Sequence, residues 1–176
     1  MRKLTGEKLE AELARLEGMR AYEHQYESAG IVCGIDEAGR GPLAGPVVAA
    51  VAVLPKDCTI LRLNDSKKLS EKCREELFLE IKEKAAAYGI GIVSPEVIDS
   101  INILQATYEA MRQAVAQLPQ EPDIFLNDAV IIPGISEEKQ IKIIKGDAKS
   151  VSIAAASILA KVTRDHMMME YEKIYP

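Results

Sequence analysis

The chain has 176 residues, of which 48% are hydrophobic and 28% charged, and its formal net charge is −5. This length and composition are typical of one globular domain with a sizeable core. No apolar run approaches the roughly 18 residues that cross a bilayer, and the charged N-terminal residues lead us to expect no secretory signal.

Hydrophobic periodicity predicts strands alternating with helices, which is typical of an α/β domain. In chain order, the expected elements are a helix over 6–27, strands over 30–36 and 46–54, a helix over 71–87, a strand over 88–93, a helical turn from Pro95, a helix over 103–117, strands over 124–128 and 141–144, and a helix over 150–173. Thr5 and Ser70 are the expected caps of the first two helices.

The net charge counts mildly against a nucleic-acid partner, because phosphate binding prefers a basic surface. Basic residues near the motifs described below weaken that objection: Lys67, Lys68, Lys142, Lys145, Lys149, Lys161 and Arg164. The three cysteines, Cys33, Cys58 and Cys73, are odd in number and lack a CxxC spacing. We therefore expect neither a disulfide framework nor a structural zinc site, and a reducing, cytoplasmic compartment.

Carboxylates stand where the predicted strands end. Asp36 and Glu37 close the first strand, Asp128 closes the fourth, and Asp147 lies in the KGDAKS segment before the last helix. Strand ends and the loops after them build the sites of α/β sheets. Within a regular strand Asp36 and Glu37 would point to opposite faces, so they share a ligand only where the chain turns, at Gly39. Oxygen ligands alone suit Mg²⁺ or Mn²⁺ better than zinc.

Each of these features also has a simpler interpretation. An acidic pair before a glycine is usually a solvated loop, and Asp147 alone is more often a helix N-cap than a metal ligand. Lys67 and Lys68 alone would be a solvated pair of charges. A phosphate-binding GxxxxGK[ST] loop and the full dinucleotide-binding fingerprint are both absent from the sequence.

Several longer motifs, taken together, favour a functional interpretation over these simpler ones. They are GIDEAGRGPLAGPVVAA at 34–50, NDSKKLS at 64–70, INILQAT at 101–107, DAV at 128–130 and IKGDAKSVSIAAASILAKVTRD at 144–165. Together they cover the chain from about residue 31 to its end, and the sequence resembles the ribonuclease HII family. The resemblance implies a ribonuclease H-like mixed central sheet flanked by helices.

The resemblance also implies an activity and a metal site. The family's metal-holding, catalytic carboxylates match Asp36, Glu37, Asp128 and Asp147. Two divalent ions, Mg²⁺ or Mn²⁺, would relieve the repulsion between these acids and serve phosphodiester hydrolysis. The implied enzyme is an endoribonuclease that cuts the RNA strand of RNA–DNA hybrids and cuts 5′ to ribonucleotides embedded in DNA. Its products carry a 5′-phosphate and a 3′-hydroxyl.

Substrate-binding residues follow from the same resemblance. The main chain of Gly39, Arg40 and Gly41 would contact the 2′-hydroxyl that distinguishes RNA from DNA, and glycine allows a close main-chain approach. Further contacts to the nucleic-acid backbones are expected from Ser66, Lys67, Lys68 and Lys149.

Two departures from the family pattern qualify these expectations. Asn127 precedes Asp128 at a position where an apolar residue is typical of a buried strand end. The chain also stops at EKIYP, where the family continues with a Gly-, His- and Tyr-containing stretch. We therefore expect an N-terminal helical extension over 1–29 and a catalytic domain over 30–176 that lacks the family's C-terminal segment.

Alternatives remain open at this point. The chain could be a truncated, weakly active or inactive RNA–DNA duplex-binding fragment, or a related nuclease such as ribonuclease HIII. We expect a monomer for the full-length family, self-association for this shorter chain, and no membrane partner.

Overall fold

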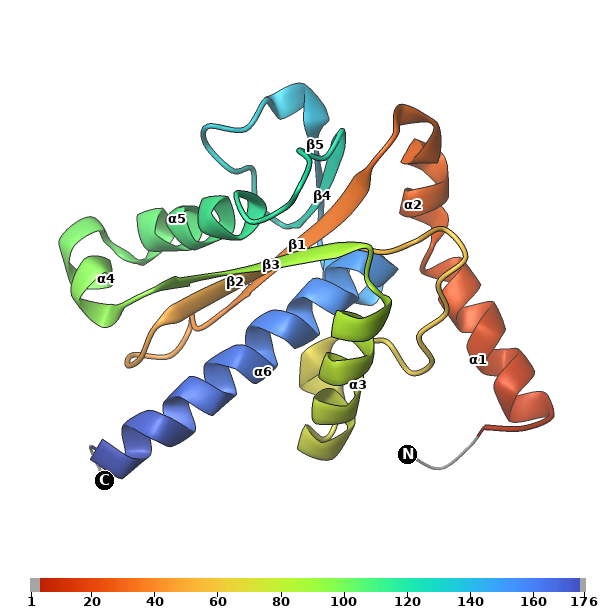
Figure 1. Cartoon of the computed structure of the whole chain (residues 1–176), viewed down its shortest axis with the longest axis horizontal. Helices are drawn as coiled ribbons and strands as arrows, with labels where there is room; N and C mark the ends of the chain where they lie inside the picture. Colours follow the sequence, from red (N-terminus) through yellow and green to blue (C-terminus); the bar gives the residue numbers. More distant parts are fainter. Residues whose placement is uncertain (1–3, 175–176) are drawn as a thin grey trace.

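The computed structural model describes residues 4–174 and contains a five-stranded mixed sheet with the order β3-β2-β1-β4-β5 (Figure 1). The strands are β1 (Val32–Ala38), β2 (Val47–Val53), β3 (Ala87–Val93), β4 (Ile124–Asp128) and β5 (Gln140–Ile143). The β1–β2 and β2–β3 pairs are antiparallel, whereas β1–β4 and β4–β5 are parallel. The predicted α/β class and mixed sheet are therefore confirmed.

Helices cover both faces of the sheet. They are α1 (Glu7–Gly18), α2 (Ala21–Tyr26), α3 (Glu71–Lys84), α4 (Pro95–Ile101), α5 (Ile103–Val115) and α6 (Val151–Ile174), with short 3-10 turns η1 (Glu27–Ala29), η2 (Ser66–Lys68), η3 (Glu137–Lys139) and η4 (Gly146–Ala148). The long helix α6 crosses one face with α3 packed beside it, and α5 lies on the opposite face (Figure 1).

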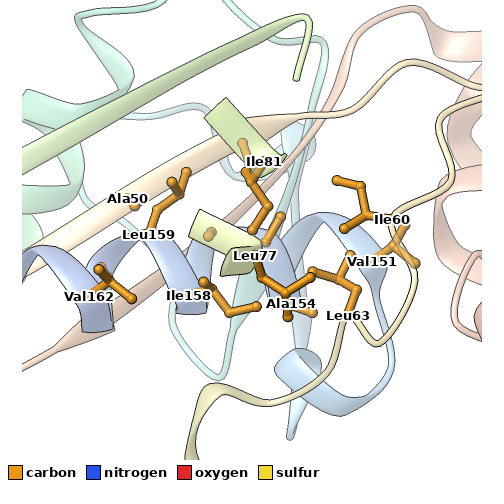
Figure 2. Packing of buried hydrophobic residues seen from close by; sticks show 14 of the residues in the cluster. Ala50, Ile60, Leu63, Leu77, Ile81, Val151, Ala154, Ile158, Leu159 and Val162 are labelled. Carbon is orange, nitrogen blue, oxygen red and sulfur yellow. The ribbon is translucent and has the colours of Figure 1, made fainter. Parts of the chain in front are cut away.

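The face under α6 is built from small and branched residues. Ile158 and Leu159 of α6 pack with Leu77 and Ile81 of α3 and with Ala50 of β2 (Figure 2). All five side chains are fully buried. Because such a core is close-packed, truncating Leu77 to alanine would cost about 2–5 kcal/mol of stability.

Gly34 lets α6 approach the sheet closely. A Cβ at Gly34 would collide with the main chain of Ser152 and Ile153 in the first turn of α6. The lack of a side chain on β1 therefore brings the start of α6, and the loop before it, next to the strand that carries Asp36.

The N-terminal segment forms two helices where the sequence predicted one. α1 ends at Gly18, a residue that disfavours helix continuation, and Gly6 rather than Thr5 occupies the N-cap position. The expected Thr5 cap is therefore wrong, whereas the Ser70 hydroxyl does cap α3 by accepting a bond from the Cys73 amide. Leu16 and Met19 are buried in the same core as α3 and α6.

The predicted division of the chain into an N-terminal extension up to residue 29 and a catalytic domain from residue 30 stays a proposal. The N-terminal helices share a hydrophobic core with the rest of the chain. Residues 1–3 and 175–176 of the two proposed segments lie outside the described residues. Within residues 4–174, no helix is both long and apolar enough to cross a membrane.

Candidate metal centre

Two carboxylates meet because β1 and β4 run parallel in a defined register. Ile35 pairs with Asn127 as the last parallel pair, so Asp36 and Asp128 follow at the same level of neighbouring strands. β1 continues to Ala38 through its pairing with β2, so the predicted strand end at Asp36 is two residues too early. Asp36 instead marks the point where β1 extends past its parallel partner.

The third carboxylate comes from the turn before α6. Asp147 lies in η4 and is buried, as is Asp36. One carboxylate oxygen from each of Asp36, Asp128 and Asp147 lies within 4.8 Å of the other two. Residues separated by more than a hundred positions thus form one acidic cluster.

Gly146 connects two members of this cluster. Its main-chain amide donates a hydrogen bond to Asp128 Oδ1 over 2.7 Å, and the next residue along the chain is Asp147. The turn that carries one carboxylate therefore also orients another.

Glu37 lies next to this cluster but is not part of the set of three. Alternation along β1 turns its side chain away from that of Asp36. Its Oε1 is 3.8 Å from Arg40 Nη1, and its Oε2 is buried without a hydrogen-bond partner among the described residues. A buried, unpaired carboxylate oxygen is costly unless a cation or donor reaches it.

Burial and mutual repulsion raise the pKa of three of these acids. Desolvation is the main cause of the raised pKa of Asp36, which lies well above its ordinary value, and the charges of Glu37 and Asp128 add to it. Desolvation also raises the pKa of Glu37, against the opposing effect of Arg40. For Asp147, desolvation and the charge of Asp65 raise the pKa. Like charges held in one buried place are relieved by a bound cation or by protonation of one of the acids.

These residues fit a divalent metal ion. The cluster found among the described residues offers carboxylate oxygens alone, the donor set that Mg²⁺ and Mn²⁺ prefer. The unpaired Oε2 of Glu37 adds an oxygen beside the cluster. Asp36, Asp128 and Asp147 would hold the ion directly, with Glu37 as a further donor.

Arg164 of α6 holds the loop after β1 by hydrogen bonds. This arginine is buried, its Nε donates to the Pro46 carbonyl over 2.9 Å, and its Nη2 donates to the Ala44 carbonyl over 2.7 Å. Gly39 has a φ of +101°, and a Cβ there would collide with the Arg164 side chain and the Pro46 carbonyl. The sequence indicated Arg164 only as one of several cations, since hydrogen bonds to main-chain carbonyls leave no pattern.

Arg40 and Gly41 occupy the outer part of this loop. The Arg40 side chain is exposed apart from its approach to Glu37. Gly41 is exposed, and a Cβ there would meet no atom of the described residues within 4 Å. The space beside Gly41 is therefore open to a ligand.

The η2 turn contributes a cation and an unexpected acid. The positive charge of Lys67 lowers the pKa of both Glu37 and Asp147. Asp65 caps η2 by accepting a bond from the Lys67 amide over 2.9 Å, and its carboxyl contacts Asp147. Sequence reasoning missed Asp65, although it stands directly before the Ser66-Lys67-Lys68 run.

The other predicted substrate contacts differ in exposure. Ser66 is buried, and its hydroxyl accepts a bond from the Ser157 hydroxyl over 2.8 Å. Its side chain thus joins η2 to α6, and its role in binding stays a prediction. Lys68 and Lys149 are exposed on η2 and directly after η4.

Asn127 is explained by a buried polar network. Its Nδ2 donates to Gln140 Oε1 over 2.8 Å, and Gln140 also bonds the main chain of Ile132 and Ile135. The polar residue at the end of β4 therefore ties that strand to β5 and the following loop. It does not disturb the register of Asp128.

Acidic residues at the same level of two central parallel strands, together with a third acid before a helix, are typical of a ribonuclease H-like fold and form a candidate carboxylate metal centre. A model of the ribonuclease HII family matches residues 33–175. The chain is 59% identical to a ribonuclease HII of Lachnoclostridium phytofermentans and 56% identical to one of Ruminiclostridium cellulolyticum, over 97% and 96% of its length. It belongs to the ribonuclease HII family.

A solved structure agrees with this assignment. The ribonuclease H2 of Pyrococcus horikoshii superimposes with a TM-score of 0.67 at 30% identity, covering 82% of this chain and 77% of that protein. The chain spans 66% and 67% of the lengths of the two bacterial relatives.

Proposed function

We propose that this chain provides the catalytic core of a metal-dependent endoribonuclease. It would hydrolyse the RNA strand of RNA–DNA hybrids and cut 5′ to ribonucleotides embedded in DNA, leaving 5′-phosphate and 3′-hydroxyl ends. The observation that carries the proposal is the convergence of one carboxylate oxygen from each of Asp36, Asp128 and Asp147 within 4.8 Å, where β1 extends past its parallel partner β4.

The acidic residues have distinct tasks in this proposal. Asp36, Asp128 and Asp147 would hold the metal directly, and the unpaired oxygen of Glu37 would be a further donor beside them. Two bound Mg²⁺ or Mn²⁺ ions would lower the pKa of an attacking water and stabilise the leaving oxygen in an in-line displacement at phosphorus. The positive charge of Lys67 partly offsets the negative charge of Glu37 and Asp147.

The Gly39–Gly41 loop is proposed to recognise the ribose of the substrate. The open space at Gly41 supports a close main-chain approach to a 2′-hydroxyl. Arg40 is exposed and has a planar fork of donors that suits a phosphate. The exposed Lys68 and Lys149 are proposed to contact the backbones of the duplex.

Cleavage of a matched pair of duplexes tests this function. One DNA duplex carries a single ribonucleotide and the other carries deoxyribose at that position, each incubated with Mg²⁺, Mn²⁺ or EDTA. We expect a cut just 5′ to the ribonucleotide, with either metal and not with EDTA. Binding without a cut in all three conditions would instead support a duplex-binding fragment.

Two further properties belong to the proposal. The free thiols of Cys33 and Cys58 support a reducing, cytoplasmic location. Exposed apolar side chains support concentration-dependent self-association of this chain: Leu43, Ile144, Met169 and Ile174. Sedimentation velocity over a range of concentrations measures that association, and one species at every concentration would contradict it.

A further inference from the structure

The first turn of α6 is capped by the N-terminal segment of the chain. The first amides of a helix have no partner within the helix. Here the Val151 amide donates to the Met19 carbonyl over 3.2 Å, and the Ser152 amide donates to Glu23 Oε1 over 3.0 Å. A carboxylate at this position also interacts favourably with the helix dipole.

Glu23 also holds the residue that precedes α6. The Ser150 hydroxyl donates to Glu23 Oε1 over 2.6 Å and accepts a bond from the Ile153 amide over 3.1 Å. Ser150 is fully buried. A single carboxylate oxygen thus fixes both the last residue of the preceding loop and the first turn of the helix.

From Ser150 the contacts lead directly to the metal centre. The Ser150 amide donates to the Gly146 carbonyl over 2.9 Å, and the Gly146 amide donates to Asp128 Oδ1 over 2.7 Å. Asp147 lies between these residues in the chain. A shift of Ser150 would therefore displace two of the three clustered carboxylates.

We propose that Glu23 is a positioning residue that sets the geometry of the metal centre from the N-terminal helices. This inference rests on the proposed function, and it assigns a role to a segment that precedes the family match at residue 33. The segment is held in place independently of Glu23, because Leu16 and Met19 are buried in the core.

The test compares Glu23→Ala with Glu23→Gln and with the control Glu17→Ala. Glu17 is exposed on α1 and contacts His24, so its loss leaves α6 untouched. Mn²⁺ binding is measured by isothermal titration calorimetry without substrate. Partners that orient metal ligands typically contribute about 10- to 100-fold in affinity. We expect Glu23→Ala to weaken Mn²⁺ binding by about tenfold or more.

Cleavage data give a second readout. For Glu23→Ala, the metal concentration that supports half-maximal cleavage should rise with the dissociation constant, while kcat at saturating metal changes less. Glu23→Gln keeps an oxygen that accepts from Ser150 and Ser152, so it should recover most of the affinity. Ser150→Ala removes the middle contact and should resemble Glu23→Ala.

Two outcomes distinguish failure of the positioning role of Glu23 from failure of the proposed function. If Glu23→Ala lowers the melting temperature but leaves Mn²⁺ affinity unchanged, Glu23 is structural only and the positioning role is overturned. If the wild-type chain binds Mn²⁺ without cutting any ribonucleotide substrate, the proposed function fails. In that case a loss of affinity in Glu23→Ala still supports the positioning role.

Discussion

Asp36 on β1 and Asp128 on β4 stand at the same level of two neighbouring parallel strands, one residue beyond the Ile35–Asn127 pair. The backbone register places the two residues side by side, and the Gly146 amide holds the Asp128 carboxylate by a hydrogen bond. With Asp147 they form a cluster of like charges in which Asp36 and Asp147 are buried and Asp128 is half-buried, which is costly to the fold in the absence of metal. Under the proposed function, this arrangement lowers the stability of the metal-free fold and provides the ligands for a metal ion.

Asp36→Asn should distinguish the effect of the acidic cluster on cleavage from its effect on stability. Loss of a direct metal ligand should reduce cleavage by about 100- to 1,000-fold, the scale of the charge stabilisation that a metal supplies. In EDTA the free energy of unfolding should rise by on the order of 1 kcal/mol, because one member of the acidic cluster is neutralised. Cleavage assays and chemical denaturation measure the two quantities.

Asp99→Asn is the matched control, since Asp99 is an exposed acid on α4. It should leave both cleavage and unfolding unchanged. An Asp36→Asn protein that turns over at the wild-type rate in Mg²⁺ would show that Asp36 is not a metal ligand.

The strands and the main acids could be predicted because they depend on local patterns. Buried strands have runs of apolar residues. Asp36 follows such a run directly, and Asp128 follows one with only Asn127 between. The exact end of β1 could not be predicted, because β2 pairs with residues beyond Asp36. That pairing is a property of the sheet and not of the strand.

The supporting residues were harder to foresee. Arg164 bonds a carbonyl 118 positions away, and Glu23 bonds a serine hydroxyl 127 positions away. Neither contact follows a helix or strand period, so only the folded chain reveals it. Asn127 appeared unusual for a buried strand for the same reason, because its partner Gln140 lies on the next strand.

The pH dependence of stability follows from the raised pKa values. The unfolded chain loses the Asp36 proton near its ordinary pKa of 3.8, whereas the folded chain keeps it to higher pH. Above pH 3.8 the folded state therefore binds more protons, and the free energy of unfolding falls as pH rises toward the folded pKa. The loss is about 1.4 kcal/mol for each unit of pKa difference.

Calorimetry in EDTA at about pH 5 and about pH 8 tests this linkage. The melting temperature of Asp36→Asn relative to wild type should increase between the two, by about 2–4 °C per kcal/mol for a chain of this size. Saturating Mg²⁺ at the higher pH should remove the difference or reverse it. A constant difference at both pH values in EDTA would mean that Asp36 does not titrate abnormally.

Gly41→Val tests the proposed approach to the 2′-hydroxyl. A side chain at Gly41 meets no atom of the described residues within 4 Å, so the fold should tolerate it. We expect an unchanged melting temperature and a fall in kcat/KM on the single-ribonucleotide duplex of about tenfold or more, because one lost contact of about 1.4 kcal/mol has that effect.

Gly39→Val is the informative comparison. Its positive φ and its contact with Arg164 make this substitution strained in the protein itself. It should lower both stability and activity, whereas Gly41→Val should lower activity alone. Normal cleavage by Gly41→Val would exclude a close contact of the substrate with that residue.

Arg164→Met should release the loop that holds Gly39–Gly41. The substitution removes the hydrogen bonds to the Pro46 and Ala44 carbonyls, at a cost of about 1–3 kcal/mol. Because Asp36 and Asp128 are set by strand register, metal binding should remain close to wild type. The KM for the single-ribonucleotide duplex should rise more than kcat falls.

Calorimetry and steady-state kinetics measure these effects. Lys161→Met is the control, because Lys161 pairs with Asp165 on the same helix. An Arg164→Met protein with unchanged KM and weakened Mn²⁺ binding would mean that Arg164 supports the metal centre and not the loop.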